Sequence, residues 1–277
     1  MKHKPLYVLL LLICLAGILF SGYKIYDKIK LYRMEQKVSQ QMQQYIQIPA
    51  TEPPSATSEV ETTDFVPDSA SGSNMTVTVP VLPSLPPEPP VVYPTVDFEA
   101  LHELNPDIIG WIYIENTNVN YPILQGKDNR EYVETMPNGW YNASGSIFMD
   151  YRNNKDFSGH NSVLYGHNMQ NGSMFADIVK YKDPAFLAEH PIVMIMTPNG
   201  NFRYRVIAGY VASLSDAAWQ LEFASDEDFG GWLYDTLARS QIKTDYELDP
   251  TDTLLTLSTC TYEFSQARYV LICAIMD

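Results

Sequence analysis

Three residues in the C-terminal half of the sequence have side chains suited to nucleophilic catalysis. The final segment, TLSTCTYEFSQARYVLICAIMD (256–277), contains Cys260 and Arg268. A thiol acts as a nucleophile in its thiolate form, and a nearby guanidinium favours the thiolate and can stabilise an oxyanion. A cysteine nucleophile also needs a proton shuttle. Among the five histidines, His167 is favoured because YGHNM places it where a strand gives way to a loop, and His160 is the alternative.

Strand register supports the pairing of this cysteine with the arginine. The segments DTLLTLSTC and ARYVLICAIM have the composition of strands, and a turn centred near Phe264 sets Cys260 directly opposite Arg268. Side chains in directly opposed positions lie about 5 Å apart at Cβ. Cys273 is an odd number of residues from Arg268, so it points to the other face of the sheet, which argues against a Cys260–Cys273 disulfide. A bulge in YEFSQ would shift this register.

Each of these residues also has an ordinary structural explanation. A lone cysteine in a strand is usually a small core residue, and a charged residue at a strand start is usually solvated. Glu263, the carboxylate nearest to Cys260 in the sequence, is expected to be a solvated turn residue rather than a third catalytic member. The sequence has no Cys-x-x-Cys pair and no Cys/His cluster, so we expect no structural zinc site.

A series of short strands must position these residues. We expect strands in the segments that end at Ile114, in NVNYPILQG, in GSIFMDYRN and in NSVLYGHNM, followed by a hairpin in PIVMIMTPNGNFRYRVIAGYVA that turns at residues 198–200. A short helix precedes the first strand, and a second helix is expected from about Glu227 to Gln241. Many short strands, few helices and no βαβ rhythm predict a mostly antiparallel barrel or sandwich.

The N-terminal segment is typical of a membrane anchor. Residues 6–22, LYVLLLLICLAGILFSG, are uncharged and would span roughly 25 Å as a helix, close to the lower limit for a bilayer core. Basic residues flank the run on both sides, so charge does not set its orientation. We expect residues 1–23 to be a retained signal anchor, with a cleaved signal peptide as the alternative.

Two further segments separate this anchor from the expected domain. The pattern of residues 24–48 predicts a polar, weakly amphipathic helical stalk. Residues 49–95 are rich in Pro, Ser and Thr, a composition that predicts a disordered linker. An extended linker of this length would tether a domain well away from a membrane. The domain itself is expected over residues 96–277.

The overall composition narrows the possible functions. The chain has 277 residues with 45% hydrophobic content, enough for one sizeable domain with appendages. Its formal net charge is −15, which argues against nucleic acid as a partner. Three cysteines are too few for a disulfide scaffold.

The motif around the cysteine resembles a known family. TLSTC (256–260) is similar to the T-L-x-T-C signature of sortases, which are membrane-anchored cysteine transpeptidases of mainly Gram-positive bacteria. Their arginine follows on the next strand, as Arg268 does, and their histidine precedes, as His167 does. The segments NPDIIGWIYI, YPILQGKDN and GSIFMDYRN, and the helix expected near residues 227–241, resemble class B sortases. The resemblance extends over residues 96–277.

The resemblance implies a mostly β fold: an eight-stranded sortase-type β-barrel with an N-terminal helix and an inserted helix between two late strands. It implies that Cys260 attacks the carbonyl of a sorting motif and that His167 protonates the leaving amine and then deprotonates the incoming one. It implies that Arg268 holds the substrate carbonyl and its oxyanion. Tyr165 and Ser258 are expected to line the peptide groove, and no metal or cofactor is implied.

The same resemblance implies the partners and the location. The acyl donor is a C-terminal sorting motif of secreted proteins, and the acceptor is an amine on a lipid-linked peptidoglycan precursor or a pilin-like protein. The chain is expected to cross the cell membrane once, with an extracellular catalytic domain.

Two other functions remain open at this point. One is a cysteine endopeptidase in which water resolves the thioester, and a supplied amine separates it from a transpeptidase. The other is a non-enzymatic surface adhesin or scaffold, in which Cys260 would be dispensable.

Overall fold

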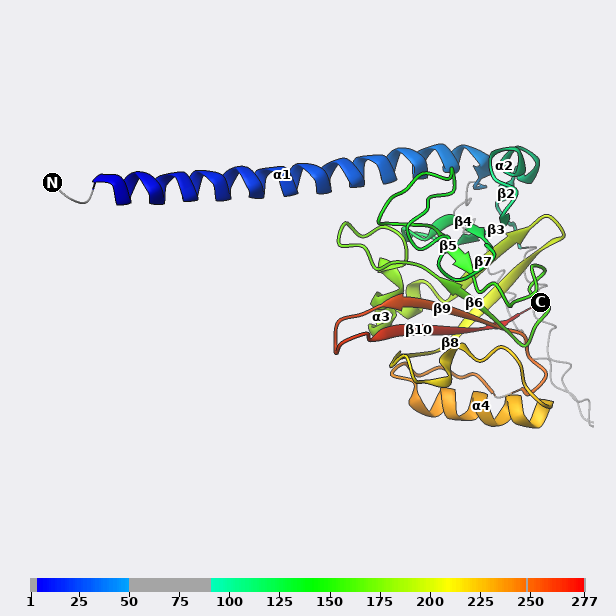
Figure 1. Cartoon of the computed structure of the whole chain (residues 1–277). Coiled ribbons are helices and arrows are strands. Elements are labelled where there is room, and N and C mark those ends of the chain that lie inside the picture. The colour runs from blue at the N-terminus through cyan, green and yellow to red at the C-terminus, as the bar shows by residue number, and fades with distance from the viewer. Residues whose placement is uncertain (1–3, 50–90, 248, 277) are drawn as a thin grey trace, which may run out of the picture.

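Eight strands close into a barrel in the computed structural model, which describes residues 4–49, 91–247 and 249–276. The strand order around the barrel is β10-β8-β7-β3-β4-β5-β6-β9 (Figure 1). Neighbouring strands are antiparallel except for β4–β5 and β6–β9, which are parallel. The barrel confirms the fold expected from the sequence. Its strands are β3 Ile108–Tyr113, β4 Asn120–Leu124, β5 Ile147–Met149, β6 Asn161–Tyr165, β7 Ile192–Thr197, β8 Gly200–Ala212, β9 Leu254–Cys260 and β10 Arg268–Ile275.

Apolar side chains from alternate positions fill the barrel interior, as the period of two in a strand requires. Leu164, Leu257 and Leu271 are fully buried there, on strands β6, β9 and β10. The predicted hairpin is confirmed by β7 and β8, which pair from Thr197↔Gly200 outward.

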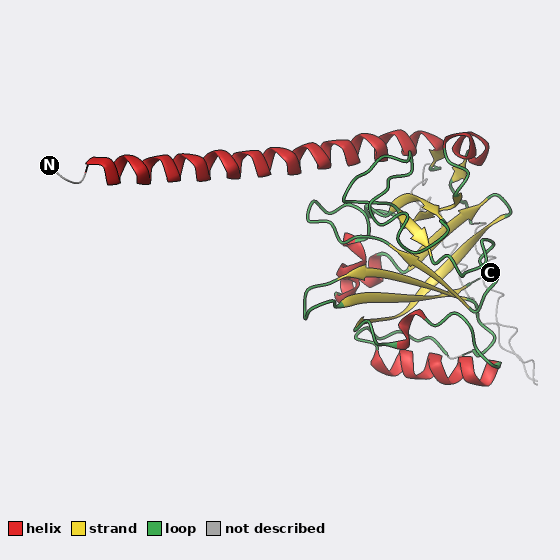
Figure 2. Cartoon of the chain, in the orientation of Figure 1, coloured by secondary structure: helices red, strands yellow, loops and turns green. Residues whose placement is uncertain are grey.

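Helices cover two outer faces of the barrel (Figure 2). Helix α2 (Phe98–Leu104) lies before β3, and its first turn is capped by Asp97, which accepts a hydrogen bond from Ala100 N at 3.0 Å. Helix α4 (Asp226–Arg239) lies between β8 and β9, as the sequence predicts, and packs Phe229 and Leu233 against the outside of β8 and β10. Shorter helical segments between the strands are η2 (Ala176–Lys182), α3 (Pro184–Glu189) and η3 (Ala217–Trp219).

The long N-terminal helix α1 (Lys4–Met42) packs on the barrel through its C-terminal part. Val38 and Met42, one helical turn apart, are 7% and 1% exposed. They join the core cluster that contains Trp111 and Leu101. This part of the expected stalk therefore contributes to the same core as the residues after 96, because its apolar stripe has the spacing that buries one helix face.

The expected separation between the N-terminal helix and the barrel differs from what the structure shows. After α1, the 3₁₀ turn η1 (Gln43–Tyr45) leads into β1 (Ile46–Gln47), which pairs with β2 (Thr95–Val96) in an antiparallel two-stranded sheet. The two ends of the Pro-rich segment are thus held side by side. Its length does not set the distance between α1 and the barrel, because α1 contacts the barrel directly. The disorder expected for residues 49–95 falls almost entirely outside the described residues.

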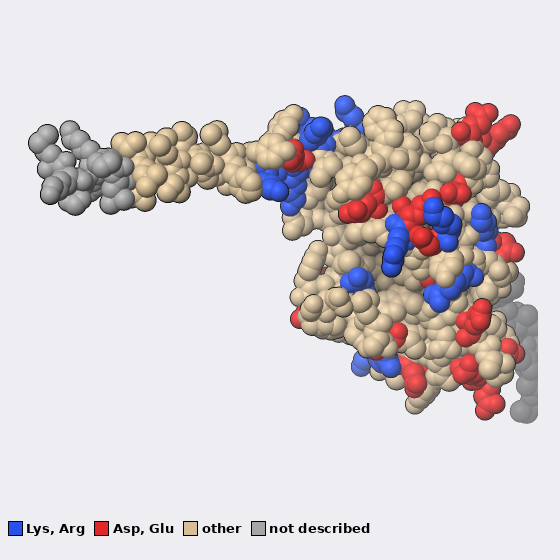
Figure 3. Space-filling model, in the orientation of Figure 1, with Lys and Arg blue, Asp and Glu red and all other residues tan. Residues whose placement is uncertain are grey.

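The N-terminal part of α1 is a candidate membrane anchor. Its apolar side chains from Val8 to Phe20 are exposed, and the helix is long and apolar enough to cross a membrane. Lys and Arg side chains gather where α1 meets the barrel (Figure 3), and residues 8–23 of the helix before them include no Lys, Arg, Asp or Glu. This pattern places an apolar segment next to a polar junction.

Candidate active site

The hairpin of β9 and β10 brings Cys260 opposite Arg268, as the spacing predicts. Cys260 is the last residue of β9 and is partly exposed, and Arg268 is the first residue of β10. Cys273 points to the other face and is fully buried in the barrel interior, and both cysteines are free thiols. The strand pairing therefore leaves the Cys260 thiol partly exposed beside the Arg268 guanidinium, whereas the Cys273 thiol is buried.

His167 reaches the cysteine because β6 runs parallel to β9. The two strands pair up to Tyr165↔Ser258, and Thr259 Oγ1 then donates to Gly166 O at 2.8 Å. A Cβ atom on Gly166 would lie 2.4 Å from the Ile147 side chain and 2.7 Å from the Phe175 ring, so any larger residue would force these side chains to shift. The residue after it, His167, is thus fixed near the end of β9.

A backbone carbonyl orients the His167 imidazole. Its Nε2 lies 2.8 Å from Val133 O, and a carbonyl can only accept, so Nε2 carries the hydrogen. Nδ1 is left as the ring nitrogen available to the Cys260 thiol. The hydrogen bond to Cys260 raises the pKa of His167, against the opposing effect of burial, and the Val133 carbonyl raises this pKa further.

The thiol shows the complementary shift. The hydrogen bond to His167 lowers the pKa of Cys260, burial opposes it, and the charge of Arg268 lowers this pKa further. The two directions together favour a thiolate beside an imidazolium, titrating as one coupled pair. Arg268 donates to Ala267 O at 3.1 Å. No carboxylate in the described part of the chain forms an ion pair with Arg268, so its charge stays directed at this site.

These three residues line one cavity of about 350 Å³. Tyr165 and Ser258, the two expected groove residues, line it as well. The cavity is partly open to solvent, so a peptide can enter it. Seven further lining residues were not expected from the sequence. Gly166 and Thr259 lie within the motifs YGHNM and TLSTC, next to His167 and Cys260. The other five come from loops and strands far from these motifs: Asn129, Val133, Phe148, Leu214 and Trp219.

Comparison with known proteins decides the family. The protein-family model that describes the sortase domain matches residues 112–276 of this chain. Sortase B of Staphylococcus aureus (strain NCTC 8325 / PS 47) is 34% identical over 181 residues, which is 65% of this chain and 74% of that protein. The chain belongs to the sortase family. Sortase B of Listeria monocytogenes serovar 1/2a (strain ATCC BAA-679 / EGD-e) is 36% identical over 177 residues, 63% of this chain and 72% of that protein.

Solved structures of sortase B support the assignment of this chain to class B. The Staphylococcus aureus sortase B–substrate complex matches with a TM-score of 0.62 and 34% identity, covering 65% of this chain and 84% of that one. Clostridium perfringens sortase B matches with the same TM-score and identity, covering 65% of this chain and 100% of that one. This class B sortase is therefore a cysteine transpeptidase.

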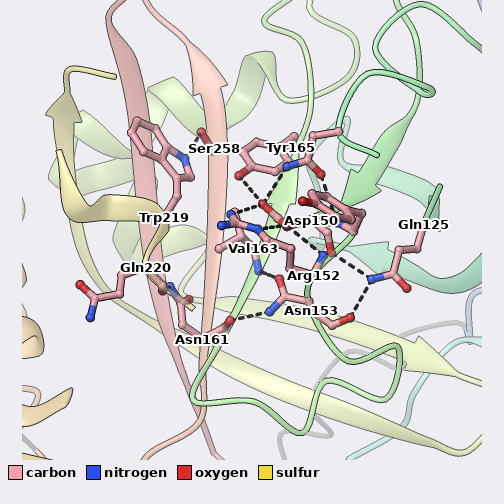
Figure 4. A network of polar contacts seen from close by, with 12 residues as sticks. Gln125, Asp150, Arg152, Asn153, Asn161, Val163, Tyr165, Trp219, Gln220 and Ser258 are labelled. Atoms are coloured by element: carbon pink, nitrogen blue, oxygen red, sulfur yellow. Dashed lines mark hydrogen bonds and ion pairs between the residues drawn. The ribbon is translucent and has the colours of Figure 1, made fainter. Parts of the chain in front are cut away.

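Tyr165 and Ser258 form the walls of the sortase cavity in different ways. The Tyr165 ring packs on Phe148 with centroids 5.3 Å apart, and its hydroxyl donates to the Asp150 carboxylate at 3.0 Å. Ser258 is 3% exposed, and its Oγ accepts from the Trp219 indole at 3.0 Å (Figure 4). Ser258 thus holds Trp219 in the wall, and its hydroxyl is engaged there.

The fully buried carboxylate of Asp150 organises the same wall. It accepts hydrogen bonds from the Arg152 guanidinium at 2.9 and 2.8 Å (Figure 4). It also accepts one from Asn129 Nδ2 at 2.8 Å. Burial by itself would raise the pKa of Asp150, but the hydrogen bonds from Arg152, Asn129 and Tyr165 outweigh it and hold the pKa below its ordinary value. The ionised carboxylate fixes Asn129 and Tyr165, two residues that line the sortase cavity.

The other acid and base candidates lie outside the cavity. His160 stacks on Phe229 of α4, with ring centroids 4.7 Å apart, and its Nε2 is 3.9 Å from Asp226. Glu263 is exposed in the turn, as expected, and a hydrogen bond from Lys182 lowers its pKa to about 2. The group that orients the histidine is therefore the Val133 carbonyl rather than a carboxylate. Across the described residues, no cluster of three His, Cys, Asp or Glu side chains could hold a metal ion.

Proposed function

We propose that this sortase cleaves a sorting motif of a secreted protein through a thioester on Cys260 and transfers the acyl group to an amine. The observation that supports these roles is the convergence of Cys260, His167 and Arg268 on one cavity. The pKa of Cys260 is lowered and the pKa of His167 is raised, and these two directions favour the thiolate nucleophile and the imidazolium acid that the reaction needs.

In the first step, the Cys260 thiolate attacks the carbonyl carbon of the scissile peptide bond. Arg268 sits opposite the sulfur-bearing residue, and its N–H groups stabilise the negative charge that develops on the carbonyl oxygen. Protonated His167 gives its proton to the leaving nitrogen as the carbon–nitrogen bond breaks. The products of this step are a thioester on Cys260, a free amine and a neutral imidazole.

In the second step, an acceptor amine attacks the thioester carbonyl. Neutral His167 takes the proton from the attacking nitrogen, Arg268 again stabilises the oxyanion, and the carbon–sulfur bond breaks. A new amide forms and the thiolate–imidazolium pair is restored. Water in place of the amine would give hydrolysis with the same residues, which is the endopeptidase alternative.

We further propose that the apolar part of α1 spans the cell membrane once and that the barrel lies outside the cell. The exposed apolar surface of α1 supports this location. Asn142 of the barrel donates a hydrogen bond to Leu31 O of α1, and Gly22 lies only about 14 Å along the helix from this contact. The barrel is then held close to the membrane, where a secreted donor and a lipid-linked or pilin-like amine acceptor would both be within reach.

A peptide-library cleavage screen with and without an amine tests the reaction. A related sortase B, 34% identical, has been solved in complex with a triglycine peptide, so triglycine is a suitable first acceptor. We expect cleaved peptides to appear as triglycine adducts, with a Cys260 acyl-enzyme detected by mass spectrometry. Only hydrolysed product at saturating amine would instead support the endopeptidase. Absence of any acyl-enzyme would contradict the assigned role of Cys260.

A further inference from the structure

Helix α1 touches the loop that follows the proposed catalytic histidine. We infer that Glu35 and Asn171 are positioning residues: the anchor helix holds the tip of the loop 168–174, and through it the imidazole of His167. This inference rests on the proposed role of His167. It makes the candidate membrane anchor part of the active-site framework.

The base of the loop is tied to the proposed catalytic residues. Phe175 N donates to His167 O at 2.9 Å, and Asn168 forms an antiparallel bridge with Met174. Asn168 Nδ2 also donates to Cys260 O at 3.0 Å. The loop is therefore a closed unit, and displacement of its base moves the imidazole relative to the thiol.

The tip of the loop is tied to α1. Asn171 Nδ2 donates to the Glu35 carboxylate at 3.2 Å, and Lys28 Nζ donates to Gln170 Oε1 at 2.6 Å. Gly172, with φ of +83°, makes the turn that presents the tip to the helix. Both contacts join residues that are more than a hundred positions apart in the sequence.

Helix α1 also contacts the segment on the other side of the imidazole. The His167 hydrogen bond goes to Val133 O, at the start of the segment 133–146. Asn142 in that segment donates to Leu31 O of α1 at 2.9 Å. Val38 packs in the same core cluster as Met136. The helix thus supports both segments between which the imidazole lies.

The chemistry of Glu35 fits a positioning role better than simple packing. The side chain is 5% exposed although it is a carboxylate. Burial raises its pKa, and the hydrogen bond from Asn171 counters this effect. An apolar residue would cover the barrel at lower cost in desolvation, whereas a buried acceptor fixes the direction of its donors. Glu35 therefore specifies where the loop tip sits.

The test uses the full chain in phospholipid nanodiscs, with Glu35→Ala, Glu35→Gln and Asn171→Ala. Gln40→Ala, exposed on the same helix, is the matched control. Two quantities are measured: kcat and KM for transpeptidation, and the pH dependence of Cys260 alkylation by iodoacetamide. Alkylation is followed by mass spectrometry on the peptide that contains Cys260, so Cys14 and Cys273 do not contribute.

We expect both alanine variants to lower kcat by roughly tenfold with KM nearly unchanged, since a misplaced catalytic group slows the chemical step. The alkylation midpoint should move to higher pH, because the thiol loses part of its contact with His167. Glu35→Gln should retain most activity, since its amide oxygen still accepts from Asn171. Gln40→Ala should match the wild type in both measurements.

Asn171 is exposed at the loop tip, so Asn171→Ala keeps the inference testable even if Glu35→Ala fails to fold. A folded Asn171→Ala variant with wild-type kcat and alkylation profile would overturn the inference, and so would a change in KM alone. A wild-type chain that shows neither turnover nor pH-dependent alkylation of Cys260 would instead overturn the proposed function. The two failures are therefore distinguishable by the behaviour of the wild type.

Discussion

The two sides of the catalytic cavity are built by different means. On one side, Cys260 and Arg268 sit on adjacent strands of one hairpin, and the backbone ladder alone sets them opposite each other. On the other side, His167 leaves the end of β6 and is held by Val133 O, by the loop 168–174 and, through that loop, by α1. The first side depends on local pairing, and the second depends on contacts between distant segments.

This difference predicts how each side responds to change. A substitution on the hairpin removes one chemical group and leaves the strand pairing intact, so its effect is large and falls on the chemistry rather than on the fold. A substitution among the distant contacts moves the imidazole without removing it, so its effect is smaller and graded. The expected effects therefore rank from loss of the nucleophile to loss of a single wall contact.

The largest effect is expected from Cys260→Ala. The change should abolish acyl-enzyme formation while the domain stays folded, because Cys260 is partly exposed and a small side chain replaces it. Cys273→Ala is the matched control inside the barrel, where it should cost stability rather than chemistry. Intact-mass spectrometry shows whether each variant forms the acyl-enzyme, and a thermal melt shows whether it stays folded. Turnover in Cys260→Ala, with Cys273→Ala inactive, would reverse the assignment.

His167→Ala should remove nearly all turnover and change the pH profile of the thiol. His167 is the leading cause of the lowered pKa of Cys260. Its loss should therefore move the alkylation midpoint to higher pH, where the thiolate forms without that partner. Turnover of the wild type should be bell-shaped in pH, with both limbs belonging to the coupled pair. His160→Ala should leave both profiles unchanged, and the opposite ranking of the two histidines would contradict the site.

Arg268→Lys should keep a folded domain but lose on the order of 10²–10³ in kcat, as expected for a missing oxyanion donor. Lysine retains the charge but not the planar fork of N–H donors. The alkylation midpoint of Cys260 should therefore shift less than in His167→Ala. Steady-state kinetics on one cleavable peptide separate the roles. A rise in KM alone would mean that Arg268 binds the substrate only in its ground state.

Removal of α1 tests the histidine side as a whole. A chain starting at residue 96 lacks Val38, Met42 and Ile46, each buried in the core cluster beside α2. Burial of each such side chain contributes about 1.5–3 kcal/mol, as an upper estimate. We expect this chain to melt well below one starting at residue 24, and to lose kcat more than substrate binding. Equal melting temperatures would show that α1 adds nothing to the domain and would favour the boundary at residue 96.

The same contrast explains what the sequence could reveal. The Cys260–Arg268 register follows from residue spacing, because a hairpin with a short turn has few alternatives. The barrel strands and α4 follow from local patterns and from the sortase motif. Val133 could not be predicted, since the group that acts is a backbone carbonyl, which any residue carries. Asp150 and Asn129 meet only when β5 and the preceding loop are folded together.

The packing of α1 on the barrel could not be predicted from the sequence for a related reason. Glu35 lies in a helical segment that the sequence predicts to be polar and only weakly amphipathic, and its partner Asn171 is 136 positions away. The pairing of β1 with β2 involves two residues on each strand, which is too short to give an alternating pattern. The composition therefore predicts an extended tether, and only the tertiary contacts of α1 with the barrel contradict that prediction.

The smallest effect is expected from Tyr165→Phe in the cavity wall. The change removes one hydroxyl that donates to Asp150, while Arg152 and Asn129 still satisfy that carboxylate. The loss should be about 1 kcal/mol in unfolding free energy, with a fall in kcat/KM of no more than roughly fivefold. Tyr141→Phe, at a position 65% exposed, is the control and should change neither quantity. Because the phenyl ring still packs on Phe148, the wall keeps its shape, and the fall should appear mainly in KM. A loss as large as that of Arg268→Lys would mean that the hydroxyl contacts the reacting peptide, and the division between a chemical side and a supporting side would not hold.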